Sequence, residues 1–185
     1  LWALAVERTG LSTFGLRVVE SMDLAQFDVQ MYAFLSSANL GEGLERILRY
    51  HRLNHDAAML GVTRTETQAI YRHHLPGGHT LPAAAAQFVV GVMVRAVRAA
   101  TDGRAEILEV RFQHEAPADT SDYEQVLDAP IVFGAEYNEA VLPLSALEVP
   151  HVKADPGLTM VLDRHAEALL ASLPKTEQGL ADRVR

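Results

Sequence analysis

Cysteine is absent from the 185-residue chain, and its absence removes several kinds of protein at once. Without cysteine there is no disulfide framework, no zinc site built on thiolates, no iron–sulfur cluster and no cysteine nucleophile. Lysine is nearly absent too, with 2 residues against 14 arginines. A cysteine-free composition fits a reducing interior, so we expect a cytoplasmic protein.

Positive charge is also scarce. The 16 lysines and arginines stand against 24 acidic residues, which gives a formal net charge of −8 at pH 7. DNA or RNA binding needs clustered positive charge to contact phosphates, so this chain by itself is a poor nucleic-acid-binding candidate. Hydrophobic residues make up 49% and charged residues 22%, which is typical of a globular domain.

Long hydrophobic runs are missing. The most apolar stretch, Leu81 to Val94, is interrupted by Arg95 before it reaches the roughly 20 residues that cross a bilayer. A buried helix is the better interpretation of this stretch. No basic segment precedes an apolar run with a small-residue cleavage site, so we expect neither a signal peptide nor a membrane partner.

The common catalytic motifs do not occur: there is no GxSxG elbow, no Walker loop, no GxGxxG opening a helix and no HExxH. Eight histidines make a metal site the first alternative to weigh. His51 and His55 stand four residues apart, but two imidazoles are only half of a usual zinc site. His73 and His74 point to opposite faces of an expected strand, which disfavours joint chelation. We expect no metal and no cofactor.

An enzyme would need a polar constellation inside a cleft, and the one grouping to nominate is His114 with Tyr123 or Asp119. Asp119 clusters with Asp122 and Glu124 at an expected helix start, where exposed N–H groups favour carboxylates without any catalytic role. We therefore expect that the chain is not an enzyme.

Apolar residues at helical spacing predict helices through the first third of the chain. Ser12 or Thr13 is expected to cap a short helix, and a second helix is expected over 24–37 with Phe27 on its apolar face. Asn39 precedes the clearest pattern, in which apolar side chains recur at i, i+4, i+7 and i+8: Leu40, Leu44, Ile47 and Leu48.

The pattern then changes to two extended runs, 57–63 and 67–75, which read as a hairpin. After a proline–glycine turn, Thr80 is expected to cap a long apolar helix that ends at Asp102-Gly103. Arg95 and Arg98, near the end of that helix, are expected to face water.

The remaining third mixes both periods. Residues 106–114 alternate like a half-buried strand, and 131–133 and 139–142 are expected to form a second hairpin. A short helix around Tyr123 and a final helix over 156–173, with His165 facing inward, complete the set. The predicted fold class is α+β, with a small antiparallel or mixed sheet of about five strands packed with several helices.

Two stretches of the sequence resemble a known family. The first is LSSANLGEGL at 35–44, followed by LRYHRL at 48–53, and the second begins VRFQHEAP at 110–117 and continues through PIVF at 130–133 to ADP at 154–156. They resemble the N-terminal effector domain of AraC-type transcriptional regulators, in the arabinose-binding-like branch. The resemblance runs from residue 11 to residue 174.

The resemblance implies a domain organisation and a set of partners. Residues 1–174 would form an effector-binding and dimerisation domain truncated at its N-terminus, and 175–185 a linker and the start of a missing helix-turn-helix domain, with Leu180 and Val184 at helical spacing. The partners would be a small-molecule effector, DNA through the missing C-terminal domain only, and a second copy of the chain in a homodimer.

We expect the effector in a cavity between the sheet and the apolar helix. The residues proposed to bind it are Tyr71, Phe88, Arg111, His114 and Phe133. Each has a structural alternative: the aromatic residues and His114 suit a core, and Arg111 suits a surface pair with acidic neighbours. The alternative function is a dimerisation and interaction module that binds no effector.

Overall fold

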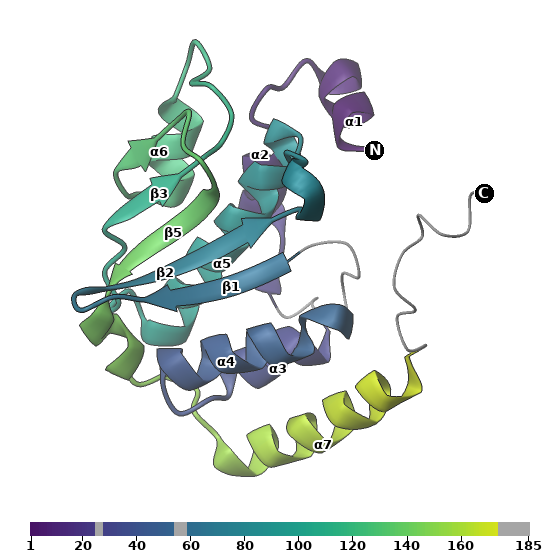
Figure 1. Cartoon of the computed structure of the whole chain (residues 1–185), viewed down its shortest axis with the longest axis vertical. Helices are drawn as coiled ribbons and strands as arrows, with labels where there is room; N and C mark the ends of the chain where they lie inside the picture. The colour runs from purple at the N-terminus through teal and green to yellow at the C-terminus, as the bar shows by residue number, and fades with distance from the viewer. Residues whose placement is uncertain (25–27, 54–58, 174–185) are drawn as a thin grey trace.

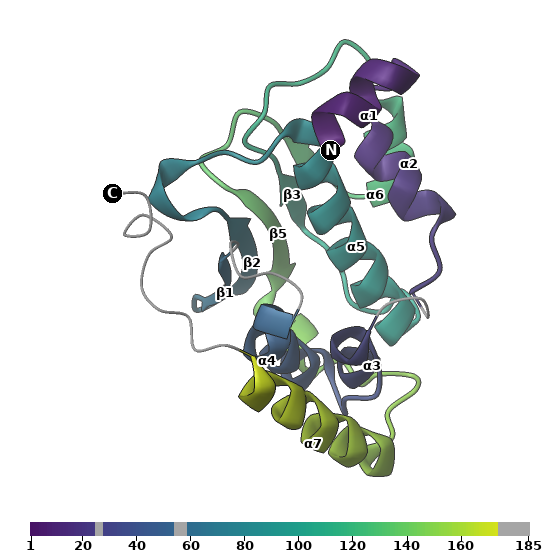
Figure 2. The same cartoon turned by 90° about the vertical axis from the view of Figure 1, so that its right-hand side faces the viewer.

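The computed structural model describes residues 1–24, 28–53 and 59–173. Within them a mixed five-stranded sheet is packed by helices, which confirms the α+β fold class. The long helix α5 (Ala83–Thr101) lies between the sheet and helix α2 (Phe14–Ser21) (Figures 1 and 2). The other helices are α1 (Trp2–Thr9), α3 (Val29–Leu35), α4 (Leu40–Tyr50), α6 (Ser121–Leu127) and α7 (Pro156–Ser172).

The strand order is β1-β2-β5-β3-β4. Strands β1 (Met59–Arg64) and β2 (Gln68–His74) form the expected antiparallel hairpin, and β5 (Asn138–Pro143) is antiparallel to both β2 and β3 (Glu109–Arg111). The second expected hairpin is wrong, because β4 (Ile131–Val132) runs parallel to β3. Strand β3 pairs with the edge of β5 that β4 would need in order to form the hairpin, and no local sequence pattern predicts that long-range pairing.

Helix α5 forms the centre of the core. By length and composition it could cross a membrane, but 61% of its apolar window is buried inside the molecule, as in a core helix. Thr80 does not cap it: Pro82 holds the N-cap position, with no side-chain cap. Arg95 and Arg98 do not simply face water, because their guanidinium groups donate to the carbonyl oxygens of Val19 and Leu127.

Helices α2 and α5 approach each other closely. A Cβ atom on Gly15 would lie 2.0 Å from the carbonyl oxygen of Ala84, so only glycine fits this crossing. The Gly15 N–H donates to Oε1 of the buried Gln87 at 3.0 Å, and the Gln87 side chain also bonds the Tyr123 hydroxyl at 2.7 Å. One buried amide thus joins α2, α5 and α6.

Helices α3, α4 and α7 pack together at one end of the sheet (Figure 1). The predicted cap of α4 is confirmed, since Oδ1 of Asn39 accepts from the Glu42 N–H at 2.9 Å. Thr13 sits at the N-cap of α2, but its hydroxyl bonds Asp122 instead of the helix backbone. Phe27, assigned by its spacing to the helix before α4, lies outside the described residues.

Helix α7 is rotated relative to the expectation. Thr159 and Ala166 are its buried residues, whereas His165 is exposed and does not face inward. The helix is held by polar contacts, because Asp163 accepts from Tyr50 at 2.8 Å and pairs with Arg46 at 3.2 Å. Leu162, Ala166 and Leu170 pack against Ala33 and Tyr50. Four other apolar side chains of the helix are left partly in solvent, with exposed fractions of 38 to 58%: Leu158, Met160, Val161 and Leu169.

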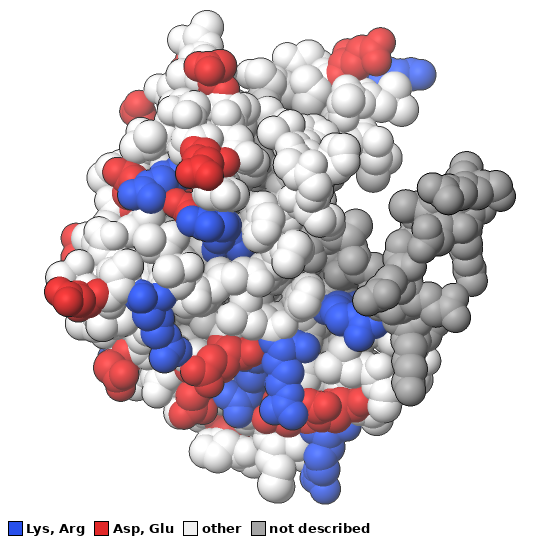
Figure 3. All heavy atoms as spheres, in the orientation of Figure 1, with Lys and Arg blue, Asp and Glu red and all other residues white. Residues whose placement is uncertain are grey.

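Charges of both signs are interspersed over the face of the molecule that carries the sheet (Figure 3). Most of the basic groups there stand beside acidic ones, and the described part of this face shows no broad basic area. A surface of this kind does not present the clustered positive charge that DNA binding requires.

Candidate ligand-binding site

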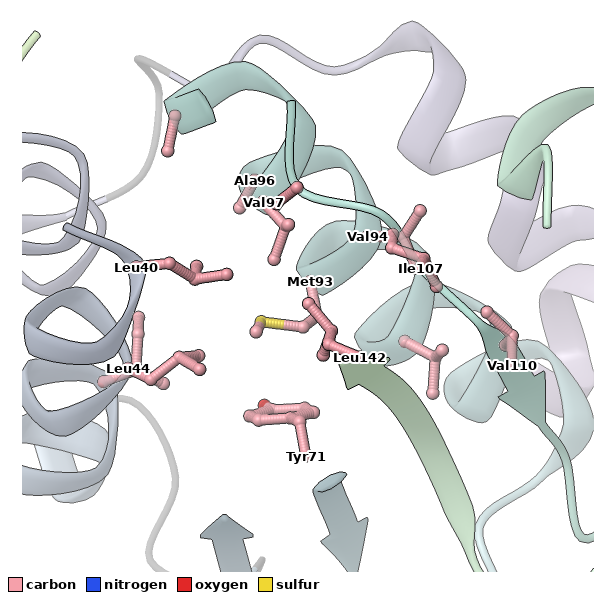
Figure 4. Packing of buried hydrophobic residues seen from close by; sticks show 14 of the residues in the cluster. Leu40, Leu44, Tyr71, Met93, Val94, Ala96, Val97, Ile107, Val110 and Leu142 are labelled. Carbon is pink, nitrogen blue, oxygen red and sulfur yellow. The ribbon is translucent and has the colours of Figure 1, made fainter. Parts of the chain in front are cut away.

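A cavity of about 100 Å³ lies between α5 and the sheet, where α3 and α4 close the end of the core. Tyr71 of β2 faces Met93 of α5, with Leu40 and Leu44 of α4 beside them (Figure 4). The lining residues come from α3 and the residue that caps it, from α4 and α5, and from strands β1 and β2: Asp28, Gln30, Met31, Phe34, Ile47, Leu60, Tyr71, His73, Phe88, Val89, Val92, Met93 and Ala96.

The local sequence places these side chains by two periodicities. Side chains on β2 alternate between the two faces of the sheet, so Tyr71 and His73 turn towards α5 while Arg72 turns away. On α5, Phe88, Val92 and Ala96 recur every four residues and share one face. That face fronts the cavity, where Phe88 and Val92 are half-buried and Ala96 is buried.

Tyr71 supplies an unused polar group. Its side chain is 5% exposed, and its hydroxyl makes no hydrogen bond within the described part of the chain. Burial raises the pKa of Tyr71 above its ordinary value, so the hydroxyl keeps its proton. The hydroxyl is therefore available to bond a ligand in the cavity that Tyr71 lines.

The remaining polar residues of the lining are largely committed. Asp28 caps α3, because its carboxylate accepts from the Gln30 N–H at 3.0 Å. The Gln30 side-chain amide donates to the carbonyl oxygen of Ile47 at 2.7 Å. His73 is buried on β2. No arginine or lysine occurs among the lining residues in the part of the chain that the structure describes.

The five residues proposed from the sequence fall into three places. Tyr71 and Phe88 both line the cavity. His114 and Phe133 instead join an aromatic cluster beside α6 with Phe112 and Tyr123, at ring-centroid distances of 5.0 to 6.0 Å. Burial lowers the pKa of His114, and Nδ1 of that residue lies 2.9 Å from the Glu115 carbonyl oxygen.

Arg111 lies on the opposite face of the sheet from the cavity. It pairs with Glu109 and, at 3.0 Å, with Glu139, which also pairs with Arg72 at 2.7 Å. The hydrogen bond to Glu109 is the main cause that raises the pKa of Arg111. These contacts match the structural alternative for Arg111, a pair with acidic neighbours.

The grouping nominated for catalysis is only partly assembled. The Tyr123 hydroxyl lies 3.4 Å from Nε2 of His114, but it already takes part in the Gln87 bond. Asp119 is exposed at the start of α6, where its carboxylate accepts from the Ser121 N–H at 2.9 Å. Within residues 1–24, 28–53 and 59–173, no three His, Asp or Glu side chains converge to hold a metal ion. His55 lies outside that part.

Sequence reasoning missed the lining that α3 and α4 contribute. Met31, Phe34 and Ile47 carry the ordinary helical signal of core residues, and nothing local distinguishes a residue facing a cavity from one facing a filled core. The sequence could have pointed to His73, because the alternation along β2 places it on the same inward face as Tyr71.

Larger hollows of about 320 to 500 Å³ occur elsewhere on the described surface. They are lined mainly by exposed or charged side chains, such as Arg46 and Asp163 between α4 and α7. The smaller cavity against α5 is the one with apolar, buried walls, the usual character of a small-molecule site.

Comparison with known proteins places the chain among regulators. The ornithine utilization regulator of Pseudomonas aeruginosa is 28% identical over 188 residues, covering 95% of this chain and 52% of that protein. The chain thus spans about half the length of the curated relative. The crystal structure of transcriptional regulator CdpR from Pseudomonas aeruginosa shares the fold, with a TM-score of 0.66 and 19% identity over 84% of this chain and 53% of that one.

A family model gives the assignment directly. The model described as the arabinose-binding domain of AraC transcription regulator, N-term, matches residues 1–151, which is most of the chain. The order of helices and strands and the resemblance at 35–53 and 110–156 lie within or next to this match. The chain therefore belongs to the family of N-terminal arabinose-binding domains of AraC-type transcription regulators.

Proposed function

We propose that this chain is the ligand-sensing part of an AraC-type regulator, in which a small molecule occupies the cavity between α5 and β2. The observation that supports this most is the apolar cavity itself, with the unpaired Tyr71 hydroxyl on its wall. Residues 1–174 would form the sensing and dimerisation domain, and 175–185 the link to a helix-turn-helix domain. The protein would act in the cytoplasm, contact DNA only through that further domain, and perform no catalysis.

The contacts around the cavity suggest how its occupancy would be transmitted. Phe34 of α3 and Ile47 of α4 line it, and both helices pack against α7 on their other side. The links to α7 are specific: Thr159 bonds Ser36 at 2.9 Å, and Asp163 bonds Tyr50. A shift of α3 and α4 would move α7, which directly precedes residues 174–185. The effect is bounded by the difference in ligand affinity between the two states.

Thermal unfolding with a metabolite panel of amino acids, fatty acids and aromatic acids tests the proposal. A ligand present at about 100 times its Kd adds about 2.7 kcal/mol and raises the melting temperature of a domain of this size by about 5 to 10 °C. Val92→Phe, which fills the cavity, should abolish the response. Val161→Phe, which adds the same bulk on exposed α7, should keep it.

A panel that produces no stabilisation, or one whose hits stabilise Val92→Phe as strongly as wild type, would contradict the proposal. Retained folding of Val92→Phe is checked by its own cooperative melting transition.

A second candidate, the dimerisation module, has one observation in its favour. The outer face of α7 leaves Leu158, Val161 and Leu169 partly exposed, with Val161 at 51%. Apolar residues grouped on one helix face are typical of a protein interface. Sedimentation of wild type and Val161→Glu separates the two functions: a dimer lost in the variant, together with no ligand response in either protein, would favour the module.

A further inference from the structure

We infer that His114 and Tyr123 form a pH-sensitive contact, which fastens α6 to α2 and α5 while His114 is neutral and releases α6 when His114 takes up a proton. The contact lies in the aromatic cluster beside α6, and neither residue lines the α5–β2 cavity. The inference therefore does not depend on the proposed ligand-sensing function.

The buried side-chain amide of Gln87 is held in one orientation by the backbone around it. Its Oε1 accepts from the Gly15 N–H at 3.0 Å, and its Nε2 donates to the Ser12 carbonyl oxygen at 2.9 Å. The reverse orientation would set two donors against each other at Gly15 and two acceptors at Ser12. The other hydrogen of Nε2 is donated to the Tyr123 hydroxyl oxygen at 2.7 Å. The Tyr123 oxygen is therefore the acceptor in that bond.

The hydroxyl proton of Tyr123 is left for a different partner. Tyr123 is 1% exposed, and burial raises the pKa of Tyr123, so the hydroxyl keeps its proton at neutral pH. Within the described residues the acceptor beside this hydroxyl is Nε2 of His114, at a long 3.4 Å. Tyr123 thus accepts from Gln87 and donates to His114.

His114 can accept this bond in one of its two neutral tautomers. Its Nδ1 lies 2.9 Å from the Glu115 carbonyl oxygen, which only accepts, so Nδ1 carries the hydrogen. Nε2 of the neutral ring is then an acceptor that faces Tyr123. The hydrogen bonds from Gly15 to Glu115 form one network, which joins α2, α5 and α6 to the segment that follows β3.

A proton added to Nε2 of His114 breaks this network between His114 and Tyr123. Protonated Nε2 is a donor, so it and the Tyr123 hydroxyl would present hydrogens to each other. A hydroxyl that turns away meets the rings of Phe112 and Phe133, at centroid distances of 5.5 and 5.1 Å, which offer no comparable acceptor. A buried hydroxyl left unpaired in this way weakens the packing of α6.

The charged groups of the surrounding elements do not compensate the protonated ring. Tyr123 is the titratable group that contacts His114, and the Glu115 carboxylate lies towards Gly134. The other acidic side chains of α6 and of the segments beside it have partners of their own: Asp122 with Thr13 and Arg17, Glu124 with Thr120, Asp119 with the Ser121 N–H, and Glu136 with Tyr137.

The pH range of the release follows from the two states of His114. Burial lowers the pKa of His114, and the bond to the Glu115 carbonyl oxygen only partly opposes it. The released ring titrates near the ordinary pKa of about 6.5, so the released state binds more protons below that pH. The contact is therefore intact above about pH 6.5 and is lost as the pH falls through the lowered native pKa. His114 is only half-buried and Glu115 is exposed, so protons from solvent reach the ring.

Nuclear magnetic resonance of the histidine side chains tests the contact in the 185-residue chain. Long-range ¹H–¹⁵N spectra show which ring nitrogen carries the hydrogen, and a pH titration gives the pKa of His114. We expect the Nδ1–H tautomer at pH 7.5. Tyr123→Phe keeps the ring but removes the bond that favours neutral His114, so the pKa of His114 should rise towards its ordinary value.

Two results of these spectra would overturn the inference. One is the Nε2–H tautomer in wild type, a measurement that needs no variant. The other is a pKa of His114 that stays the same or falls in Tyr123→Phe, as expected if burial alone acts on the ring, because phenylalanine is less polar than tyrosine.

Amide hydrogen exchange measures the release of α6. From pH 7.5 to pH 5.5 the protection factors of α6 amides, which are corrected for intrinsic exchange, should fall by about 2- to 10-fold, the range for one proton taken up on opening. His114→Gln places an amide oxygen that accepts at both pH values and should abolish the fall. His151→Gln, which removes a different buried histidine, should keep it. Unchanged protection in wild-type α6, or the same fall in His114→Gln, would overturn the release of α6.

Discussion

Two buried tyrosines differ in what their hydroxyls meet. Tyr50 is fully buried, and its hydroxyl donates to the Asp163 carboxylate at 2.8 Å. Burial, together with that hydrogen bond, raises the pKa of Tyr50 to about 12. The Tyr71 hydroxyl has no such partner in the described structure. The Tyr71 hydroxyl is therefore available to a ligand in the cavity, whereas that of Tyr50 is committed to Asp163.

The contrast gives a stability prediction. Tyr50→Phe should lower the free energy of unfolding by about 1 kcal/mol or more, because it removes a bond to a carboxylate. Tyr71→Phe should leave that free energy unchanged or raise it by up to about 1 kcal/mol, because no bond is lost. Urea unfolding of both variants beside wild type measures the difference. Equal losses in the two variants would show that Tyr71 is bonded in the ligand-free protein.

Buried histidine gives the folded state a defined pH dependence. His151 is 5% exposed and packs at 5.1 Å from the Phe34 ring, and burial lowers its pKa. The unfolded chain binds the proton near the ordinary pKa of about 6.5, so it holds more protons than the native state below that pH. The contribution of His151 to stability is therefore fully present above about pH 6.5, and it is lost as the pH falls through the lowered native pKa.

Urea unfolding at pH 7.5 and pH 5.5 tests this. Wild type should be less stable at pH 5.5, and His151→Gln should show a smaller loss between the two pH values. His165→Gln, at an exposed position on α7, should keep the wild-type loss. An identical loss in all three proteins would refute the assignment to His151.

At the scale of elements, the crossing of α2 over α5 depends on one glycine. Gly15→Ala would put its Cβ 2.0 Å from the Ala84 carbonyl oxygen, so α2 must move away. We expect a loss of about 1–3 kcal/mol in the free energy of unfolding. Gly61→Ala in β1 is the matched control, since a Cβ there meets nothing within 4 Å. A loss in Gly15→Ala no larger than in Gly61→Ala would contradict the close approach.

The sequence alone predicts most of the elements and fewer of their contacts. Periodicity located α4, α5 and the β1–β2 hairpin, because each signal is local. Tyr71 and Phe88 line the cavity, and their role in binding a ligand stays a prediction. The pairing of β4 with β3, the rotation of α7 and the cavity wall from α3 depend on contacts between residues far apart in the chain. Likewise, His114 and Phe133 are residue types that suit a ligand site, but they pack into a separate aromatic cluster.

At the scale of the whole molecule, α3 and α4 connect the cavity to α7. Occupancy of the cavity should slow amide hydrogen exchange in α7 as well as in α5 and β2, because ordering one wall stabilises the helices packed on it. Asp163→Asn weakens the links to Arg46 and Tyr50 and should reduce the effect on α7 while keeping that on α5. Rates of amide hydrogen exchange in wild-type α7 that do not change when the ligand is added would refute this route of transmission.

We propose that a small molecule binds between α5 and β2 and that its binding controls the domain. A crystal structure of the chain with the compound that stabilises it most tests this proposal. We predict electron density for the compound against Met93 and Phe88, with a polar atom within hydrogen-bond distance of the Tyr71 hydroxyl. Density for the compound at another surface, with the α5–β2 cavity closed by side chains, would contradict it.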